Sequence, residues 1–361
     1  MSRWNFVGDL ELIRERQLEF IGEVLEKKGF KGPEARIENV GVAGDNYIAN
    51  VKRVVVTEDG KTFKMIAKLA PENQMMRFMA QIETLFRNEH TIYTDLLPKF
   101  VQLQRSAGVP EEELYRFAEC YGSLAEVPSE VILLEDLKES QYDILDRFKP
   151  LSTDNVKLVL KNFAIFHSLS YVLKHQEPET FAEIASKFGD MHSVIQQGDG
   201  WTNNIMFRCK ADAQVDCVLI DYQMVRESNP VFDIMYMMFN STSHEQRLKH
   251  YNDFIDHYHT ELDRSLHNYG LKASSIYPRD KLDCDLKRYG KLMFATSIMI
   301  TNIVLKKVED AEVMKEAMKT STTDNMEEMM AQVLKQHPET VILFKSKIEG
   351  LIDSFVEFGL L

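Results

Sequence analysis

The spacing of apolar residues changes twice in the first part of the chain. Residues 9–29 carry apolar positions at helical spacing and end in Lys-Lys-Gly, which is typical of a helix C-terminus. Residues 36–41 and 47–56 then alternate in part and hold many β-branched residues, which indicates strands. The tripeptide Glu-Asp-Gly at 58–60 predicts a turn, and residues 62–70 predict the returning strand. We therefore expect an antiparallel hairpin or meander after the first helix.

Helical spacing returns over residues 72–97. The apolar stripe predicted for this helix consists of Phe78, Ile82, Leu85, Phe86 and Tyr93. Further along, residues 130–134 (EVILL) form a short apolar run that predicts another strand. The first lobe of the protein is thus expected to be rich in strands.

The remainder of the chain is mainly helical. Residues 154–175 predict one long buried helix, residues 215–223 (VDCVLIDYQ) predict a strand, and residues 231–361 are helical and rich in Met and aromatic residues. The pattern predicts an α+β protein with two lobes. The N-terminal lobe, with an antiparallel sheet and helices, would span 1–135, and the mainly helical C-terminal lobe would span 136–361.

Composition narrows the class of protein. The 361 residues are 44% hydrophobic and 27% charged, which is ordinary for a soluble globular protein. The formal net charge of -13 argues against a nucleic-acid partner, although a local basic group could still hold a nucleotide. The four cysteines form no CxxC pair, and we find neither a signal peptide nor a membrane-length apolar run. We expect a cytoplasmic protein, a monomer rather than an oligomer, with no membrane partner.

Three polar residues have the spacing that phosphoryl transfer requires. Asp199 is followed five residues later by Asn204, and Asp221 ends the predicted strand VLIDYQ. Phosphoryl transfer needs a base that orients a hydroxyl and oxygen ligands for magnesium, and protein kinases place these residues at this spacing. On its own, however, an Asp and an Asn five residues apart more often form a turn in which both side chains cap local backbone.

Two further residues occur in the order that a kinase requires. Lys68 lies on the predicted strand at 62–70, where a lysine can bind the α- and β-phosphates of a nucleotide, and Glu89 follows on the next helix, where it can hold that lysine. Each residue alone is more simply a solvated surface charge. The ordered set of lysine, glutamate, Asp-x4-Asn and a strand-ending Asp is much harder to obtain by chance.

The segment GVAGDNY at 41–47 lies between two predicted strands, where a kinase folds a loop over the phosphates. It has only two glycines and lacks the GxGxxG pattern, so a plain β-turn is the simpler interpretation. If the loop does bind nucleotide, Gly44, Asp45 and Asn46 are the candidate residues.

Taken together, the residues resemble a known family. The segments GDNYIANVKRVVV, IAKLAP, FRNEHTIYTDLLP, LLEDL, FHSLS, GDGWTNNIMF and VLIDYQ occur here in the order found in the insect ecdysteroid kinase-like family. That family is grouped with the choline and aminoglycoside kinases. The resemblance implies a protein-kinase-like fold of two lobes and the use of ATP and Mg²⁺.

The resemblance also implies roles for individual residues. Asp199 would be the catalytic base, and Asn204 and Asp221 would be the magnesium ligands. Lys68 would bind the phosphates, with Glu89 as its partner. The segment from residue 134 to 137, which contains Glu135 and Leu137, would be the hinge whose backbone holds adenine.

One position departs from the family pattern. The family usually has His-Gly-Asp at the catalytic loop, whereas this chain has Gln197-Gly198-Asp199. In kinases that histidine is a scaffold for the loop and does not take the proton. Gln also carries a donor and an acceptor, so we expect catalysis to be slowed or intact.

The resemblance implies that the substrate is a steroid-like alcohol, an ecdysteroid. Two alternatives stay open: the same fold acting on choline, a sugar, an aminoglycoside or a plant toxin, or a non-catalytic protein that binds a hormone or nucleotide. Met235, Met238 and Phe239 share one side of a predicted helix and are more simply core residues than a wall for a flat ligand. We expect His167 to be a buried, hydrogen-bonded histidine and Asp233 to pair with an arginine.

Overall fold

The computed structural model describes the chain except for residues 1–3, 33, 42–48, 189–193, 211–212 and 320–337. The described residues form two compact units, and each is made of several stretches of the chain. Unit 1 is drawn from 1–94, 118–140 and 306–337, and unit 2 from 95–117, 141–305 and 338–361. The predicted boundary between lobes at residues 135 and 136 stays a prediction.

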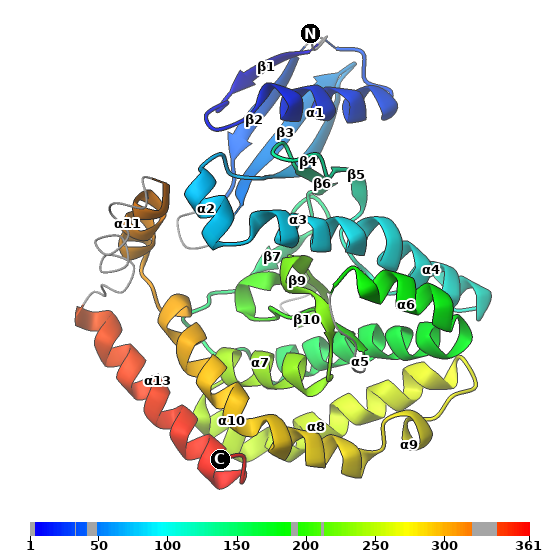
Figure 1. The fold of residues 1–361 in the computed structure, drawn as a ribbon, viewed down its shortest axis with the longest axis vertical. Coiled ribbons are helices and arrows are strands. Elements are labelled where there is room, and N and C mark those ends of the chain that lie inside the picture. Colours follow the sequence, from blue (N-terminus) through cyan, green and yellow to red (C-terminus); the bar gives the residue numbers. More distant parts are fainter. Residues whose placement is uncertain (1–3, 33, 42–48, 189–193, 211–212, 320–337) are drawn as a thin grey trace. The chain divides into compact units, whose positions relative to one another are not determined.

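Unit 1 is built on a six-stranded sheet with the order β1-β2-β3-β4-β6-β5 (Figure 1). The strands are β1 Asn5–Gly8, β2 Glu34–Asn39, β3 Asn50–Glu58, β4 Lys61–Leu69, β5 Cys120–Leu124 and β6 Val131–Glu135. Pairing is antiparallel except between β1 and β2. The predicted hairpin is confirmed, because β3 and β4 are joined at Asp59 and Gly60, whose φ angles of 50° and 74° are those of a tight hairpin turn.

Helix α1, Glu15–Lys27, covers one face of this sheet (Figure 1). Its apolar side packs into a core with inward-facing residues of the strands, among them Val54, Met65 and Leu133. The approach is close at Gly122 on β5, where a Cβ would lie 2.8 Å from Val24 of the helix. The helix predicted over 9–29 is therefore present, but it begins later, at Glu15, and ends earlier, at Lys27.

The helix predicted over 72–97 is divided into α2 Gln74–Met79, α3 Ile82–Thr91, a π-helical turn at Ile92–Leu96 and α4 Leu97–Ser106. The break comes at Gln81, whose φ of 53° is left-handed. Four of the five stripe residues are buried as predicted, but Phe78 is 72% exposed, so its assignment was wrong. The break changes the helical phase, and Phe78 no longer shares a face with Ile82.

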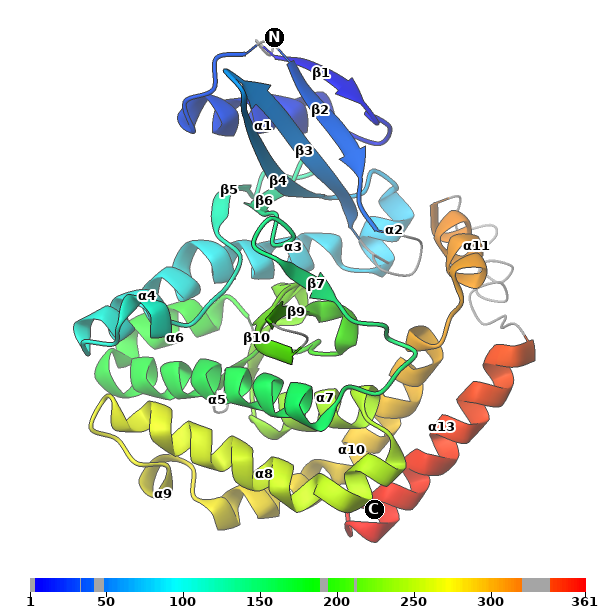
Figure 2. The same ribbon diagram turned by 180° about the vertical axis from the view of Figure 1, so that it is seen from behind.

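Unit 2 is organised around α5, Thr153–Gln176, which confirms the long buried helix. It packs along α8, His244–His267, as Figures 1 and 2 show from opposite sides. By length and hydropathy α5 could cross a membrane, yet 67% of its apolar window is buried inside the protein, as in the core helix of a soluble protein. The other α-helices that the structure describes in unit 2 are α4, α6 Pro178–Ser186, α7 Val231–Ser241, α9 Ala273–Ile276, α10 Arg279–Val304 and α13 Pro338–Glu357. Helix α11, Val308–Lys319, belongs to unit 1.

Two small sheets in unit 2 present the loops that carry the polar residues. One has the order β10-β9-β7, from β10 Ala213–Leu219, β9 Ile205–Lys210 and β7 Tyr142–Ile144. The other pairs β8 Val194–Gln196 with β11 Arg226–Ser228. Residues 197–204 connect β8 to β9, and the strand predicted at 215–223 ends at Leu219, two residues before Asp221. The expected α+β class, with an antiparallel sheet in one part and helices in the other, is confirmed.

Candidate active site

The loop between β8 and β9 brings Asp199 and Asn204 together. The side-chain Nδ2 of Asn204 donates to the Asp199 carboxylate at 2.8 Å and to the Asp199 backbone carbonyl at 2.9 Å. The backbone contact is the one that a plain capped turn would make. A capped turn does not need the contact with the carboxylate. Through this contact Asn204, the predicted metal ligand, holds one carboxylate oxygen of Asp199, the predicted base.

Asp221 lies beside the same loop. The backbone N–H of Ile220, just before it, donates to the Asn204 carbonyl at 3.0 Å, which ties the end of β10 to the loop. Asp221 itself has φ 59°, a left-handed conformation that is uncommon and costly for a residue other than glycine. The structure thus places Asn204 and Asp221 in adjoining segments.

Gln197 joins these two segments through its fully buried side chain. Its Nε2 donates to the carbonyls of Ile220 and Asp221 at 2.9 and 3.1 Å, and its Oε1 accepts from the Asp199 N–H at 2.7 Å. Both ends of the amide are therefore used. The structure gives Gln197 the scaffold contacts expected of it, and its effect on catalysis stays a prediction.

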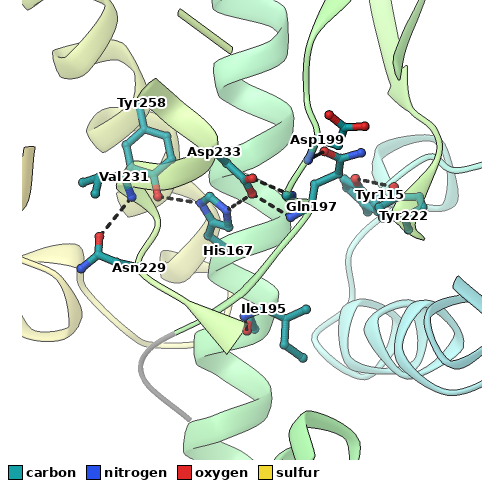
Figure 3. Close-up of polar contacts among 12 residues, drawn as sticks. Tyr115, His167, Ile195, Gln197, Asp199, Tyr222, Asn229, Val231, Asp233 and Tyr258 are labelled. Atoms are coloured by element: carbon teal, nitrogen blue, oxygen red, sulfur yellow. Dashed lines mark hydrogen bonds and ion pairs between the residues drawn. The ribbon is translucent and has the colours of Figure 1, made fainter. Parts of the chain in front are cut away.

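Asp233 of α7 holds the backbone of the loop. Its carboxylate accepts from the backbone N–H groups of Gln197 and Gly198 at 2.7 and 2.8 Å, and from His167 Nε2 at 3.0 Å (Figure 3). His167 also bonds Tyr258 through Nδ1, so the buried, hydrogen-bonded histidine is confirmed. The expectation that Asp233 pairs with an arginine was wrong. Backbone N–H groups bind the Asp233 carboxylate instead of an arginine. Such groups are present at nearly every residue, so the sequence gives no signal for this contact.

Glycine is required at position 198 of the loop. Gly198 has φ 87°, and a Cβ there would lie 2.2 Å from the Met224 carbonyl oxygen. Any side chain would force the loop away from Met224. Glycine is therefore required before Asp199 for two reasons: the positive φ angle, and the lack of room for a Cβ atom.

Tyr236 is a site residue that the sequence reasoning missed. Its hydroxyl donates to the second Asp199 oxygen, Oδ1, at 2.6 Å. Burial, together with the negative charge of Asp199, raises the pKa of the Tyr236 hydroxyl, so this group stays protonated and acts as a donor. Its position one turn after Asp233 on the same helix becomes a signal only once the contacts of Asp233 are known.

The apolar stripe on α7 belongs to the core. Met235, Met238 and Phe239 are all buried. The ring of Phe239 lies 4.0 Å from the ring of Phe355 on α13, measured between centroids. Core packing, the simpler of the two interpretations, is confirmed for these residues.

Unit 1 holds the predicted lysine and its partner. Lys68 on β4 forms an ion pair with Glu89 on α3, and the two residues are only 8% and 1% exposed. Burial of an ammonium group costs free energy unless an opposite charge lies close to it. The Glu89 carboxylate supplies that charge and stabilises the buried Lys68. The predicted contact between Lys68 and Glu89 is present.

The proposed adenine segment is also fixed within unit 1. The Glu135 carboxylate accepts from the Ser140 hydroxyl at 2.7 Å and from the Glu119 N–H at 3.2 Å. Leu137 is buried, and its carbonyl accepts from the Ser140 N–H at 3.1 Å. Gly44, Asp45 and Asn46, the predicted phosphate loop, lie outside the described residues.

The oxygen ligands that Asn204 and Asp221 carry fit a magnesium ion that is also bound by a nucleotide. The Asn204 amide nitrogen bonds Asp199, so the amide oxygen is the atom it can offer to a metal, and Asp221 offers a carboxylate. Across the described part of the chain, no three His, Cys, Asp or Glu side chains gather into a metal cage. Magnesium commonly takes one or two protein oxygens and completes its shell with phosphates and water, so the residues fit this group.

Comparison with known proteins gives the family. The sequence matches the ecdysteroid kinase-like family over residues 43–193 and 189–271. The chain belongs to the ecdysteroid kinase-like family. This ecdysteroid kinase-like protein is accordingly a small-molecule kinase, a phosphotransferase with a protein-kinase-like fold.

Solved structures similar to this ecdysteroid kinase-like protein include the GDP complex of a mutant aminoglycoside 2'-phosphotransferase-IIIa. That structure is 10% identical, has a TM-score of 0.43, and is matched over 95% of this chain and 99% of its own. A kinase domain is 11% identical with a TM-score of 0.29, over 90% and 94% of the two chains. A comparison with curated protein sequences finds no match.

Proposed function

We propose that this protein uses ATP and Mg²⁺ to phosphorylate a hydroxyl group of an apolar small molecule, and that the molecule is an ecdysteroid. The single observation that carries the proposal is the contact of Asn204 with the Asp199 carboxylate, beside the strained Asp221. The proposed base and the two proposed metal ligands lie in adjoining segments of unit 2, which supports an arrangement suited to phosphoryl transfer.

In the reaction, the Asp199 carboxylate orients the acceptor hydroxyl by accepting its hydrogen bond. The acceptor oxygen forms a bond to the γ-phosphorus, the bond from that phosphorus to the β-phosphate oxygen breaks, and ADP leaves. The proton of the acceptor hydroxyl passes to Asp199. Asn204 and Asp221 would hold magnesium, which supplies neutralisation of the phosphate charge when bound.

Unit 1 would hold the nucleotide. Lys68, oriented by its ion pair with Glu89, would bind the α- and β-phosphates. Leu137 would contact adenine through its backbone, and its carbonyl also accepts from the Ser140 N–H. The Glu135 side chain accepts from Ser140 and from the Glu119 N–H, and the Glu135 N–H donates to the Glu119 carbonyl, so contact of Glu135 with adenine would fall to its backbone carbonyl.

The ecdysteroid is the acceptor that the family name favours, and choline-like molecules, sugars and xenobiotic alcohols remain alternatives. The case for a non-catalytic binding protein rested on Gln197 and on the sparse glycine loop. The three hydrogen bonds of the Gln197 side chain support the catalytic proposal instead, because they provide the scaffold that the loop needs.

The proposal is tested in two stages. Thermal shift with ATP in the presence and absence of Mg²⁺ should show stabilisation that depends on the metal. Phosphate transfer is then measured on a panel of ecdysteroids, other sterols, choline and sugars, and an ecdysteroid should give the highest kcat/KM. Faster transfer to choline or a sugar would change the acceptor assignment. ATP binding with no phosphorylated product from any alcohol would support the non-catalytic alternative.

A further inference from the structure

Both oxygens of the Asp199 carboxylate are held by side chains of unit 2. Asn204 Nδ2 donates to Oδ2 at 2.8 Å, and the Tyr236 hydroxyl donates to Oδ1 at 2.6 Å. We infer that Tyr236 is a positioning residue that fixes the orientation of the catalytic carboxylate toward the acceptor hydroxyl. This inference rests on the proposed function, because it assigns Tyr236 a part in the same reaction.

The position of Tyr236 follows from the helix that carries it. Asp233 and Tyr236 are three residues apart on α7 and therefore lie on one face of the helix. Asp233 holds the backbone of the loop at Gln197 and Gly198, and Tyr236 holds the side chain of the next residue, Asp199. One helical turn thus sets both the backbone and the carboxylate of the base.

The two carboxylate oxygens of Asp199 have different partners and would have different roles. Oδ2 is engaged by Asn204, whose amide oxygen would face the metal. Oδ1 is then the oxygen that the acceptor hydroxyl would approach, and an sp² carboxylate oxygen can accept from two donors. Tyr236 donates along one of those directions, so the phenol would lie beside an acceptor hydroxyl that approaches the same oxygen. Without the Tyr236 hydroxyl, Oδ1 loses a hydrogen bond that helps to fix the orientation of the carboxylate.

A buried tyrosine needs a hydrogen-bond acceptor wherever it lies, so a purely structural role has to be separated from positioning. Unit 2 offers a matched control. The Tyr277 hydroxyl also donates to a buried carboxylate, Asp285, at 2.9 Å, and it has no place in the proposed reaction. Tyr236→Phe and Tyr277→Phe remove the same chemical group from the same kind of partner.

The first readout is the coupling ratio, the amount of phosphorylated alcohol formed per ATP consumed. It uses whichever panel alcohol the wild-type protein phosphorylates, with MgATP alone to measure hydrolysis by water. Tyr236→Phe should lower kcat for the alcohol about tenfold, about 1.4 kcal/mol in the barrier, because a loosely held carboxylate misplaces a large acceptor. The KM for MgATP should stay within about twofold, and hydrolysis should fall less than transfer. The coupling ratio therefore falls.

Tyr277→Phe should reduce transfer and hydrolysis together, if at all, and leave the coupling ratio unchanged. An unchanged ratio in Tyr236→Phe, or an equal fall in both variants, would overturn the inference while leaving the proposed kinase activity intact. Urea denaturation of both variants checks that each is folded in the assay.

The second readout does not depend on activity. Crystal structures of the wild-type and Tyr236→Phe proteins should show the Asp199 side chain in one rotamer in the former and in more than one in the latter. The same single rotamer in both structures would overturn the inference. If the wild-type protein phosphorylates no alcohol, the proposed function fails, and this comparison still decides whether Tyr236 orients the carboxylate.

Discussion

The Asp233 carboxylate offers the sharpest single test of how the catalytic loop is held. It accepts from the N–H groups of Gln197 and Gly198 and from His167 within a fully buried site. Asp233→Asn keeps the shape of the side chain but replaces one oxygen with an NH₂ group. If the amide oxygen takes the place of Oδ2, which serves two donors, the new NH₂ group faces the Gly198 N–H.

The magnitude follows from these contacts. A buried donor left without an acceptor costs about 1–3 kcal/mol, and two remaining bonds that lose their charge assistance cost about 1 kcal/mol each. We expect Asp233→Asn to lower the free energy of unfolding by about 4 kcal/mol. Gly198 immediately precedes Asp199, so a displaced loop should also lower kcat about a hundredfold.

A second buried carboxylate supplies the control. Asp285 also accepts three hydrogen bonds, from Asn229, Tyr277 and Lys281, at 2.7, 2.9 and 2.6 Å. Asp285→Asn should therefore lose stability of similar size in chemical denaturation while kcat changes little. The reasoning is refuted if the two variants lose equal stability and equal activity, because Asp233 would then matter only for folding.

Two further predictions concern residues that support the loop and the nucleotide. Gln197→His should leave kcat unchanged or raise it, whereas Gln197→Leu, which removes all three side-chain hydrogen bonds, should lower kcat at least tenfold; equal activity in both variants would argue against a scaffold role. Glu89→Gln removes the negative charge that pairs with the buried Lys68 and should raise the KM for MgATP about tenfold, as measured in nucleotide titrations. The matched control is Glu139→Gln, whose pair with Lys64 is more exposed and worth less than about 1 kcal/mol, so an equal rise there would contradict the assignment.

Local signals in the sequence predicted most of the fold correctly. The hairpin of β3 and β4 follows from Asp59 and Gly60, because few residues tolerate the positive φ that such a turn needs. The pairing of Lys68 with Glu89 was predicted from the order of a strand and a helix, whereas the burial of the pair was not predicted. Phe78 was misplaced because one left-handed residue, Gln81, shifts the helical phase, and that shift carries no strong sequence mark.

The support beneath the candidate site was harder to predict. The acceptors and donors that hold the loop are largely backbone groups, and every residue has these, so nothing in the sequence points Asp233 toward Gln197 and Gly198. Tyr236 was hidden within an apolar stretch rich in Met and aromatic residues. Its three-residue spacing from Asp233 becomes informative only once the structure shows what Asp233 binds.

The most direct test of the central claim is transfer from ATP labelled in its γ-phosphate under single-turnover conditions. The wild-type protein is compared with Asp199→Asn, each with Mg²⁺ and the best panel alcohol. We predict a labelled phosphate ester with the wild-type protein. The variant should bind MgATP with nearly unchanged affinity and form the ester at least a thousandfold more slowly, because it lacks the base that orients the hydroxyl. Ester formation by Asp199→Asn at the wild-type rate would contradict the account.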